Sequence, residues 1–332
     1  MVKNVDSAFN KFIRDVVDLE SEVSKNARRS RDWLYDQLKC LPDKSDEFPH
    51  LFSGKEVKGF GSFRRRTKIR PLDDIDLLLV ITGEGTTYTE LADKITLQVP
   101  EKAERLKRLT NDDGTLNSKR LIEKVKKALS GIHQYENAEI HRREEAATLK
   151  LKSYDWVFDI VPAFITAENS AGKTYYIIPD GSGNWKKTDP RIDNERTTEI
   201  NKNFEGKVLS FIRLVKYWNT NVSTCTISSY LIENLVLNFF SGKHDWQGKK
   251  EELKNFFSYL KGEIYNSVLD PKQIQGDLNH LNIFEKMEVS DLASKAFISI
   301  DNAIQKENEG EQEQAIGHWK EVFGKEFPTY EG

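Results

Sequence analysis

The sequence predicts an α+β protein with two lobes, in which a mixed sheet and a long N-terminal helix form the first lobe and helices form the second. Short apolar runs with strand character occur at 77–81 and 156–161, as in buried strands. From Arg196 onward the apolar residues recur every three or four positions, which is the period of a helix. Because 332 residues can hold two domains, we expect a first domain at 1–195 and a second at 196–332.

The N-terminal helix is predicted from the spacing of apolar residues between Val5 and Leu41. Most of them are three or four positions apart, which indicates one long amphipathic helix or two that are nearly continuous. Pro42 and the segment DKSDEFPH that follows it are expected to end this helix.

Composition indicates a globular protein without membrane or strong nucleic-acid partners. Hydrophobic residues make up 38% of the chain and charged residues 31%, a balance that favours a folded protein over a disordered one. No apolar run approaches the roughly 18 residues that span a bilayer, and the N-terminus lacks a signal-peptide core, so we expect a cytoplasmic protein. The net charge of −3 argues against tight binding to duplexes. Cys40 and Cys225 have no Cys or His neighbour at ligand spacing, which excludes a zinc site.

The residues with the clearest chemical meaning lie at 59–81. Asp74 and Asp76 directly precede an apolar run, and because alternate side chains of a strand share a face, their carboxylates should lie side by side. Such a pair is costly unless a cation lies nearby, and Mg²⁺ prefers carboxylate and phosphate oxygens. A turn at Gly61 and Ser62 would offer N–H groups and a hydroxyl to a phosphate. The stretch predicts half of a two-metal phosphoryl-transfer site, although paired acids are also common at solvated loop ends.

A third aspartate, Asp159, lies inside the second predicted strand. An acid within an apolar strand is rarely there for packing, because its charge needs a partner. If this strand lies next to the one that carries Asp74 and Asp76, Asp159 completes a set of three carboxylates for two metal ions. Asp155 is the reserve candidate, and a simple ion pair with Lys or Arg is the alternative role for Asp159.

The segments around these strands have weaker signals. Residues 88–130 have a mainly helical pattern, in which helix 117–129 is the clearest because Asn or Ser can cap it. Strand character returns at 147–151, and a further strand at 175–179 leads into the Gly-rich turn 181–183. No helix directly follows that turn, so we do not interpret it as a phosphate-binding loop.

The second lobe is predicted to be helical. One helix should cover 196–218 and leave Lys216 off its apolar stripe, as a solvated lysine. Another should begin near Thr226, with a serine as cap and a helix N-terminus that favours anions; its first residues include Ser229, a possible cap, and Tyr230, a possible core aromatic. Further helices are expected at 249–261, 290–306 and 311–323.

The Gly-Ser turn and the spaced D-x-D pair together resemble the signature of the polymerase-beta-like nucleotidyltransferase superfamily. Within it, the strings GSFRRRTKIRPLDDID and FDIVPAF are similar to motifs of the bacterial cGAS/DncV-like nucleotidyltransferases (CD-NTases) of CBASS anti-phage systems. The similarity follows nearly the whole chain in order and implies a bilobal polymerase-beta-like fold, in which the N-terminal helix is a spine across both lobes.

The resemblance also implies roles for individual residues. The catalytic, metal-binding carboxylates would be Asp74, Asp76 and Asp159, with two Mg²⁺ ions, or Mn²⁺ in their place. RLVKYWN is similar to the family helix whose lysine, here Lys216, contacts the donor triphosphate. In the family segment that SYLIE resembles, the serine touches phosphate and the tyrosine stacks on the nucleobase, which gives these roles to Ser229 and Tyr230.

The implied function is a cyclic oligonucleotide synthase that joins nucleoside triphosphates, ATP among them, into a cyclic di- or trinucleotide and releases pyrophosphate. An effector would be reached only through that product. Two alternatives remain open at this point: transfer of a single nucleotide to RNA, protein or a small molecule, and a non-catalytic scaffold that binds nucleotide. Some CBASS operons encode ubiquitin-ligase-like enzymes, for which Gly332 would suit conjugation, whereas a frayed tail is the simpler interpretation.

Overall fold

The computed structural model describes residues 1–54, 59–91, 94–223 and 227–332. By its internal contacts the chain divides into two compact units. The sheet unit consists of Glu22–Arg65 and Leu72–Asn194, and the helical unit consists of Met1–Ser21, Arg66–Pro71 and Glu195–Gly332. The protein therefore has the predicted α+β class. Residues 1–21 and 66–71 belong to the same unit as the C-terminal helices. Cys225 and the predicted helix start at Thr226 lie outside the described residues.

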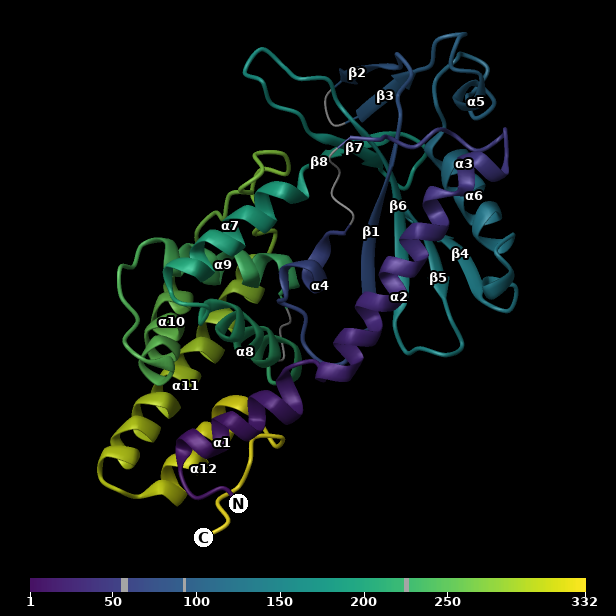
Figure 1. The fold of residues 1–332 in the computed structure, drawn as a ribbon. Coiled ribbons are helices and arrows are strands. Elements are labelled where there is room, and N and C mark those ends of the chain that lie inside the picture. The colour runs from purple at the N-terminus through teal and green to yellow at the C-terminus, as the bar shows by residue number, and fades with distance from the viewer. Residues whose placement is uncertain (55–58, 92–93, 224–226) are drawn as a thin grey trace. The chain divides into compact units, whose positions relative to one another are not determined.

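The described strands form one eight-stranded sheet (Figure 1). They are β1 (Asp74–Ile81), β2 (Thr87–Leu91), β3 (Lys94–Gln98), β4 (Glu139–Arg143), β5 (Ala146–Lys150), β6 (Val157–Ile165), β7 (Tyr176–Pro179) and β8 (Trp185–Thr188). The order is β2-β3-β8-β7-β6-β5-β4, with β1 paired to β6. This one pair is parallel and the other described pairs are antiparallel, so the sheet is mixed, as predicted.

The strands β1 and β6 form the apolar centre of the sheet unit. Every residue of β1 from Leu77 to Ile81 is buried, and so is every residue of β6 from Ile160 to Phe164. Leu78 belongs to one cluster of buried side chains and Ile81 to another. Continuous burial of this kind is what a strand covered on both faces requires.

Residues 88–91 and 94–98, for which the sequence predicts a helix, lie in the antiparallel strands β2 and β3. In β3 the buried Ile95 and Leu97 alternate with more exposed residues, and a period of two is the pattern of a half-buried strand. Threonines at 87, 89 and 96 also favour strands over helices. The helix prediction was therefore wrong for this segment.

The Gly-rich turn at 181–183 connects β7 to β8, a strand that the sequence did not predict. Asp180 Oδ1 accepts hydrogen bonds from the backbone N–H groups of Ser182, Gly183 and Asn184, at 2.8, 3.1 and 2.9 Å. Because this carboxylate occupies the N–H groups, the turn does not offer them to a phosphate.

The helices of the sheet unit are short except for two. They are α2 (Ser21–Lys39), α3 (Leu41–Lys44), α4 (Gly61–Arg65), α5 (Glu104–Lys107), α6 (Ser118–Ser130) and the 3₁₀ turn η2 (His133–Tyr135). The predicted cap of α6 is confirmed, because the Asn117 side chain accepts a hydrogen bond from Arg120 N. Pro42 does not end the N-terminal helix; it lies in the first turn of α3, where a missing N–H costs nothing.

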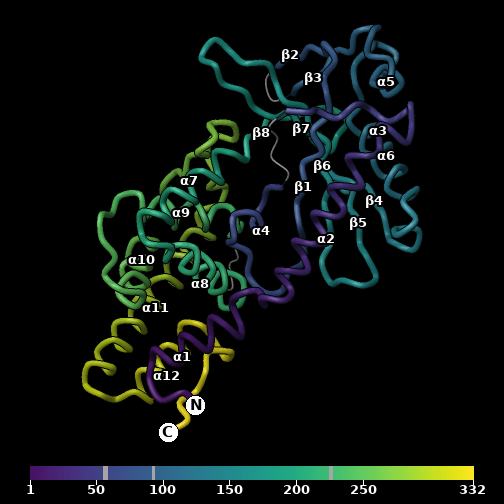
Figure 2. Tube along the Cα trace, in the orientation of Figure 1, coloured from purple at the N-terminus to yellow at the C-terminus, as the bar shows by residue number. Residues whose placement is uncertain are grey.

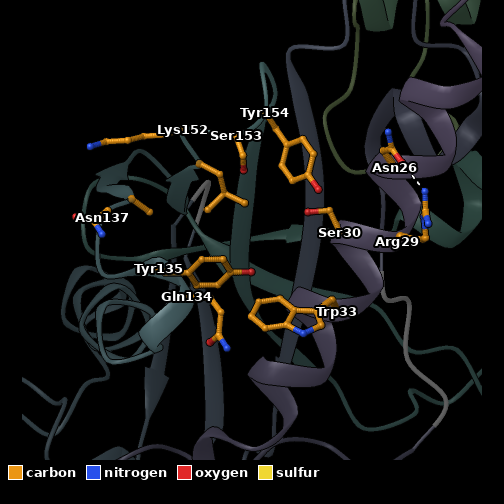
Figure 3. A pocket seen from close by; sticks show the side chains of 12 residues that line it. Asn26, Arg29, Ser30, Trp33, Gln134, Tyr135, Asn137, Lys152, Ser153 and Tyr154 are labelled. Carbon is orange, nitrogen blue, oxygen red and sulfur yellow. Dashed lines mark hydrogen bonds between the residues drawn. The ribbon is translucent and has the colours of Figure 1, made fainter.

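Helix α2 packs on the sheet unit through Trp33. Its ring meets the ring of Tyr135 edge-on, with centroids 5.4 Å apart. Beside this contact lies a hollow lined by α2 and by residues 134, 135, 137, 138 and 151–154 (Figure 3). None of the site residues predicted from the sequence lines it, so the hollow is separate from the candidate active site.

The remaining helices are α1 (Val5–Phe12), the π-helical η1 (Ile13–Val17), α7 (Pro190–Asn203), α8 (Val208–Asn221), α9 (Ser229–Ser241), α10 (Lys249–Glu263), α11 (Ile283–Asn308) and α12 (Gln312–Phe323). The N-terminal helix is therefore two nearly continuous helices, α1 with η1 and then α2, which is one of the two predicted forms. No helix in the described ranges is long and apolar enough to cross a membrane.

Residues 196–218 form parts of α7 and α8 instead of the single predicted helix. Gly206 has a φ of +85°, a left-handed conformation that commonly ends helices, and its N–H donates to Asn201 O at 2.8 Å. Helices α10 and α12 lie where the sequence predicts them. Helix α11 begins before the predicted residue 290, because Asn282 and Glu285 form a capping box.

The core of the helical unit joins the two ends of the chain. The ring of Phe9 in α1 packs edge-on against Trp319 and Phe327, with centroids 4.7 and 5.2 Å apart. Glu331 N donates to Val2 O at 2.9 Å, and Val2 N donates to Glu331 Oε2 at 2.7 Å. The N- and C-terminal ends therefore lie side by side (Figure 2), and the tail is held at Glu331 where the sequence suggested fraying.

Replacing Phe9 with Ala should lower the free energy of unfolding of the helical unit by about 3–5 kcal/mol, because it leaves a cavity among buried rings. Urea denaturation of the full chain measures the change. Tyr265→Ala is the control, since Tyr265 is exposed and its loss should cost no more than about 0.5 kcal/mol. Equal effects of the two substitutions would contradict the packing described for α1.

Candidate active site

Asp76 and Asp159 lie side by side in the sheet. The parallel register of β1 and β6 pairs Asp76 with Asp159 and Asp74 with Val157. Paired and alternate positions of neighbouring strands point to the same face, so all three carboxylates project from one face of the sheet. The residues between them, Ile75 and Phe158, are buried on the opposite face.

The Gly-Ser segment lies against the carboxylate of Asp76. Gly61 is the first residue of α4 and has a φ of +70°. A Cβ atom at this position would lie 1.8 Å from Asp76 Oδ2. Phe60 N donates to Asp76 O at 3.3 Å, which fixes the segment beside β1. Two features therefore exclude a side chain at residue 61: the close approach of the Asp76 carboxylate and the left-handed backbone conformation. Ser62 is the next residue of α4.

Asp159 is oriented by the neighbouring strand. Thr148 pairs with it in the β5–β6 register, and the Thr148 hydroxyl donates to Asp159 Oδ1 at 2.8 Å. This bond leaves the second carboxylate oxygen of Asp159 for other contacts. Asp155, the reserve candidate, is exposed in a bend before β6 begins and therefore does not share the strand face with the other three acids.

The three carboxylates fit a magnesium site that is completed by substrate oxygens. In the described part of the chain, no group of three His, Cys, Asp or Glu side chains gathers closely enough to hold a metal ion by itself. Mg²⁺ usually binds through one or two carboxylates together with substrate phosphates and water. The bare backbone at Gly61 lets the Asp76 carboxylate lie directly against it.

Lys216 is not the solvated lysine that its sequence position suggests when read alone. Its side chain is only 5% exposed, and its Nζ atom lies 3.4 Å from Oε2 of Glu233, whose side chain is 2% exposed. Thr67 is also buried, and its hydroxyl donates to the same Oε2 atom at 2.8 Å. Within the helical unit, Glu233 therefore holds Lys216 from α9.

The first turn of α9 carries Ser229 and Tyr230. The cap is Ser228, whose hydroxyl accepts a hydrogen bond from Leu231 N at 3.1 Å, and not Ser229, so the capping role suggested for Ser229 was wrong by one residue. Ser229 is exposed at the start of the helix. Tyr230 is partly buried and packs against the hydrophobic core of the helical unit.

Tyr230 is held by an ion pair that the sequence did not reveal. Lys272 Nζ lies 4.2 Å from the centre of its ring and donates to its hydroxyl, and the hydroxyl donates to Asp270 Oδ1 at 3.3 Å. Burial would raise the pKa of the Asp270 carboxyl, but hydrogen bonds from Gln275 N and Lys272 outweigh it, so the pKa lies below its usual value. Asp270 is therefore ionised and anchors both Lys272 and Tyr230.

Comparison with known proteins decides the family. No protein-family model matches the chain. A probable cyclic nucleotide synthase from Bacillus cereus strain VD146 is 63% identical over 331 residues, which cover 100% of both chains. The chain belongs to the cyclic nucleotide synthases.

More distant relatives agree with this assignment. A cyclic AMP-AMP-AMP synthase from an Acinetobacter species is 25% identical over 335 residues, which cover 96% of this chain and 84% of that protein. The structure of CdnC from Escherichia coli MS115-1 with ATP matches with a TM-score of 0.71 at 17% identity, over 97% of this chain and 98% of that one. GTP-bound DncV from Vibrio cholerae matches with a TM-score of 0.63 at 13% identity, over 95% and 92% of the two chains. The synthase therefore has the CD-NTase fold and is a nucleotidyltransferase.

In this synthase the predicted residues fall into two groups. Gly61, Ser62 and the three aspartates belong to the sheet unit, whereas Lys216, Ser229 and Tyr230 belong to the helical unit. Sequence reasoning missed the residues that hold them, namely Thr148, Thr67, Glu233, Asp270 and Lys272. For two of them the sequence offered one local signal, their position inside a motif: Thr67 lies within GSFRRRTKIR and Glu233 within SYLIE.

Replacing Gly61 with Ala should reduce product formation by about 100-fold, because a displacement of about 1 Å at a reacting group has effects of that size. The added Cβ would force the Asp76 carboxylate to move. Steady-state synthesis of the cyclic product measures the loss. Gly172→Ala is the matched control: its φ is +69°, but a Cβ there meets nothing within 4 Å. If both variants lose activity equally, backbone strain and not the approach to Asp76 is responsible.

Replacing Asp270 with Asn should lower the free energy of unfolding by about 1–3 kcal/mol at neutral pH, because it removes a charged partner of buried groups. The folded pKa of Asp270 is lowered, so its contribution is present above the unfolded pKa of about 4 and is lost as the pH falls through the folded value. Urea denaturation across this pH range should show the wild type and the variant converging in acid. A constant difference would contradict the ionised state of Asp270.

Proposed function

We propose that this synthase joins nucleoside triphosphates, ATP among them, into a cyclic di- or trinucleotide with release of pyrophosphate. The observation that supports the reaction best is the pairing of Asp76 with Asp159 beside the bare backbone of Gly61. Such an arrangement suits a phosphate that divalent cations would join to the carboxylates. Two comparisons support ATP as a substrate, namely the cyclic AMP-AMP-AMP synthase relative and the CdnC structure with ATP.

We assign the metal-binding and catalytic roles to Asp74, Asp76 and Asp159, which would hold two Mg²⁺ ions, with Mn²⁺ as a substitute. When bound, such ions neutralise phosphate charge and lower the pKa of an attacking hydroxyl. Thr148 fixes the rotamer of Asp159 by its hydrogen bond. Three carboxylates on one sheet face repel one another, and divalent cations beside them would relieve this repulsion.

We assign binding of the triphosphate to Gly61, Ser62, Lys216 and Ser229. Gly61 permits close approach of a phosphate, and Ser62 supplies a hydroxyl beside it. Lys216 supplies a cation, and Ser229 supplies an exposed hydroxyl at the start of α9, where N–H groups and the helix dipole favour an anion. Tyr230 would stack on the base through one face of its ring, because Lys272 Nζ lies over the ring, 4.2 Å from its centre.

We place the synthase in CBASS anti-phage signalling, where it would reach an effector only through its diffusible product. A C-terminal conjugation partner would act at Gly332. That residue is exposed, but its neighbour Glu331 is bonded to Val2, so conjugation would require the tail to leave the first residues of the chain.

Replacing Asp76 with Asn should reduce synthesis by at least about 1,000-fold, because it removes a negative charge from the groups that would hold the ions. The reaction contains equal amounts of the four nucleoside triphosphates with Mg²⁺, and the products are identified by mass spectrometry after phosphatase treatment. A cyclic product has no terminal phosphate and is unchanged by this treatment, whereas a linear oligonucleotide loses its terminal phosphates.

Asp155→Asn is the matched control, because Asp155 is an exposed acid just before β6 and should retain full activity. Thermal unfolding of both variants should match that of the wild type. Cyclic product from Asp76→Asn at the wild-type rate would overturn the assignment. A product from the wild type that loses terminal phosphates on phosphatase treatment would be linear and would favour nucleotide transfer without ring closure instead.

A further inference from the structure

Lys216 and Glu233 form a charge pair in the interior of the helical unit. The two side chains are almost fully buried, and their charged atoms are 3.4 Å apart. Their immediate neighbours along α8 and α9, such as Val215 and Ile232, are buried and apolar. A buried pair of this kind is no more stabilising than apolar residues of similar volume. Stability alone therefore gives little reason for it.

Glu233 also holds a segment from a different part of the chain. Its Oε2 atom accepts the hydrogen bond of Thr67, which belongs to Arg66–Pro71. This segment connects α4, which begins at Gly61, to β1 with its two aspartates. Although both of those elements belong to the sheet unit, the segment packs with the helical unit.

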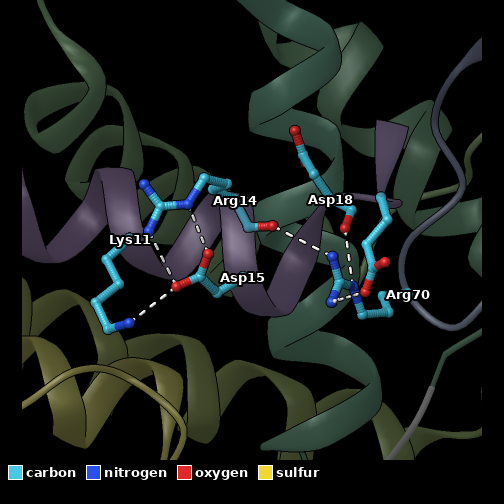
Figure 4. Close-up of polar contacts among 6 residues, drawn as sticks. Lys11, Arg14, Asp15, Asp18 and Arg70 are labelled. Carbon is cyan, nitrogen blue, oxygen red and sulfur yellow. Dashed lines mark hydrogen bonds and ion pairs between the residues drawn. The ribbon is translucent and has the colours of Figure 1, made fainter. Parts of the chain in front are cut away.

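Other bonds fix the two ends of the same segment. Arg213 Nη1 donates to Arg66 O at 2.8 Å. Arg70 Nε donates to Asp18 O at 3.0 Å, and Arg70 Nη2 donates to Arg14 O at 3.3 Å, next to η1 (Figure 4). The hydroxyl of Thr67 is thus the buried contact of a short connection that is pinned at both ends.

We propose that Glu233 is a positioning residue for nucleotide binding and turnover. Its carboxylate keeps the Lys216 ammonium in a place where a triphosphate can meet it. Through Thr67, the same carboxylate fixes the connection between the Gly61 turn and the strand that carries Asp74 and Asp76. The inference rests on the proposed function, in which Lys216 contacts the donor triphosphate.

The physical reason lies in the cost of an ammonium group without a nearby anion. A buried cation is unfavourable unless it is paired, and the Glu233 carboxylate is a buried anion 3.4 Å from the Lys216 ammonium. Loss of this carboxylate would therefore raise the cost of keeping the ammonium in its place.

The first test is a double-mutant cycle on nucleotide affinity. The dissociation constant of α,β-methylene-ATP, which cannot react, is measured by calorimetry for the full chain with Mg²⁺. Glu233→Gln should weaken binding by about tenfold, the size expected for losing a charged contact. Lys216→Met should weaken it at least as much. The double variant should be no weaker than Lys216→Met, because Glu233 acts through the lysine.

The matched control is a second buried pair of the same unit, Lys243 with Glu252, whose side chains are 18% and 0% exposed. Glu252→Gln should change stability but leave the affinity for the analogue within about twofold of the wild type, since distant sites act independently. An equal loss of affinity in Glu252→Gln, or additive losses in the double variant, would reduce Glu233 to a structural role and overturn the inference.

The second test uses Thr67 and remains available if Glu233→Gln does not fold. Thr67→Val keeps the shape but removes the hydroxyl, so kcat should fall by about fivefold while analogue affinity stays within about twofold. Thr67→Ser should restore kcat. An unchanged kcat in Thr67→Val overturns the role of this bond. If Lys216→Met binds the analogue like the wild type, the proposed function of Lys216 fails, which is a distinct outcome.

Discussion

The parallel pairing of β1 with β6 is the constraint on which the candidate site depends. It places Asp76 opposite Asp159, in a strand pair whose continuation is buried on both faces. A slip of one residue would turn every side chain of a strand to the other face, so that Ile75 would point outward and the aspartates into the core. The burial of the apolar residues beyond the acids therefore fixes the strand register, and the register fixes the face on which the carboxylates lie.

Much of this arrangement can be predicted from the sequence because it is local. The two-residue period of a strand places Asp74 and Asp76 on one face, and an acid within an apolar run marks Asp159. Gly61 and Asp76 belong to the same sequence motif, but the short distance between them is known only from the structure. Thr148 was not predicted as a partner of Asp159, because that contact depends on the register of β5 with β6 and no local pattern specifies a register.

The errors have similar causes. A helix was predicted where strands β2 and β3 lie, because exposed positions of β2 carry apolar residues such as Tyr88 and Leu91, which obscure the alternation. The break between α7 and α8 contains two residues with positive φ, Glu205 and Gly206, within an otherwise helical period. Lys216 was assigned to solvent when read alone because its partner Glu233 lies on another helix. In each case the structure is decided by contacts far from the pattern or by local backbone angles.

The helical unit contains several charges among apolar side chains, and each of those described here is paired. Three buried acids each form an ion pair with a lysine: Glu252 with Lys243, Asp270 with Lys272, and Glu233 with Lys216. Removing one member of such a pair leaves an uncompensated charge, whereas removing both is often neutral. Evolution of this unit should therefore proceed by paired changes, and the Asp270 pair, which also contacts Tyr230, should be the most constrained.

The mutual bonds of Val2 and Glu331 have a consequence for engineering the chain. Because its two ends already lie together, a short flexible linker from Gly332 to Met1 would close the backbone into a ring without moving either end. New termini could then be opened at the exposed turn around Gly172, which no neighbouring atom crowds and which connects β6 to β7. Circular permutation of this kind is tolerated where termini are close and loops are exposed.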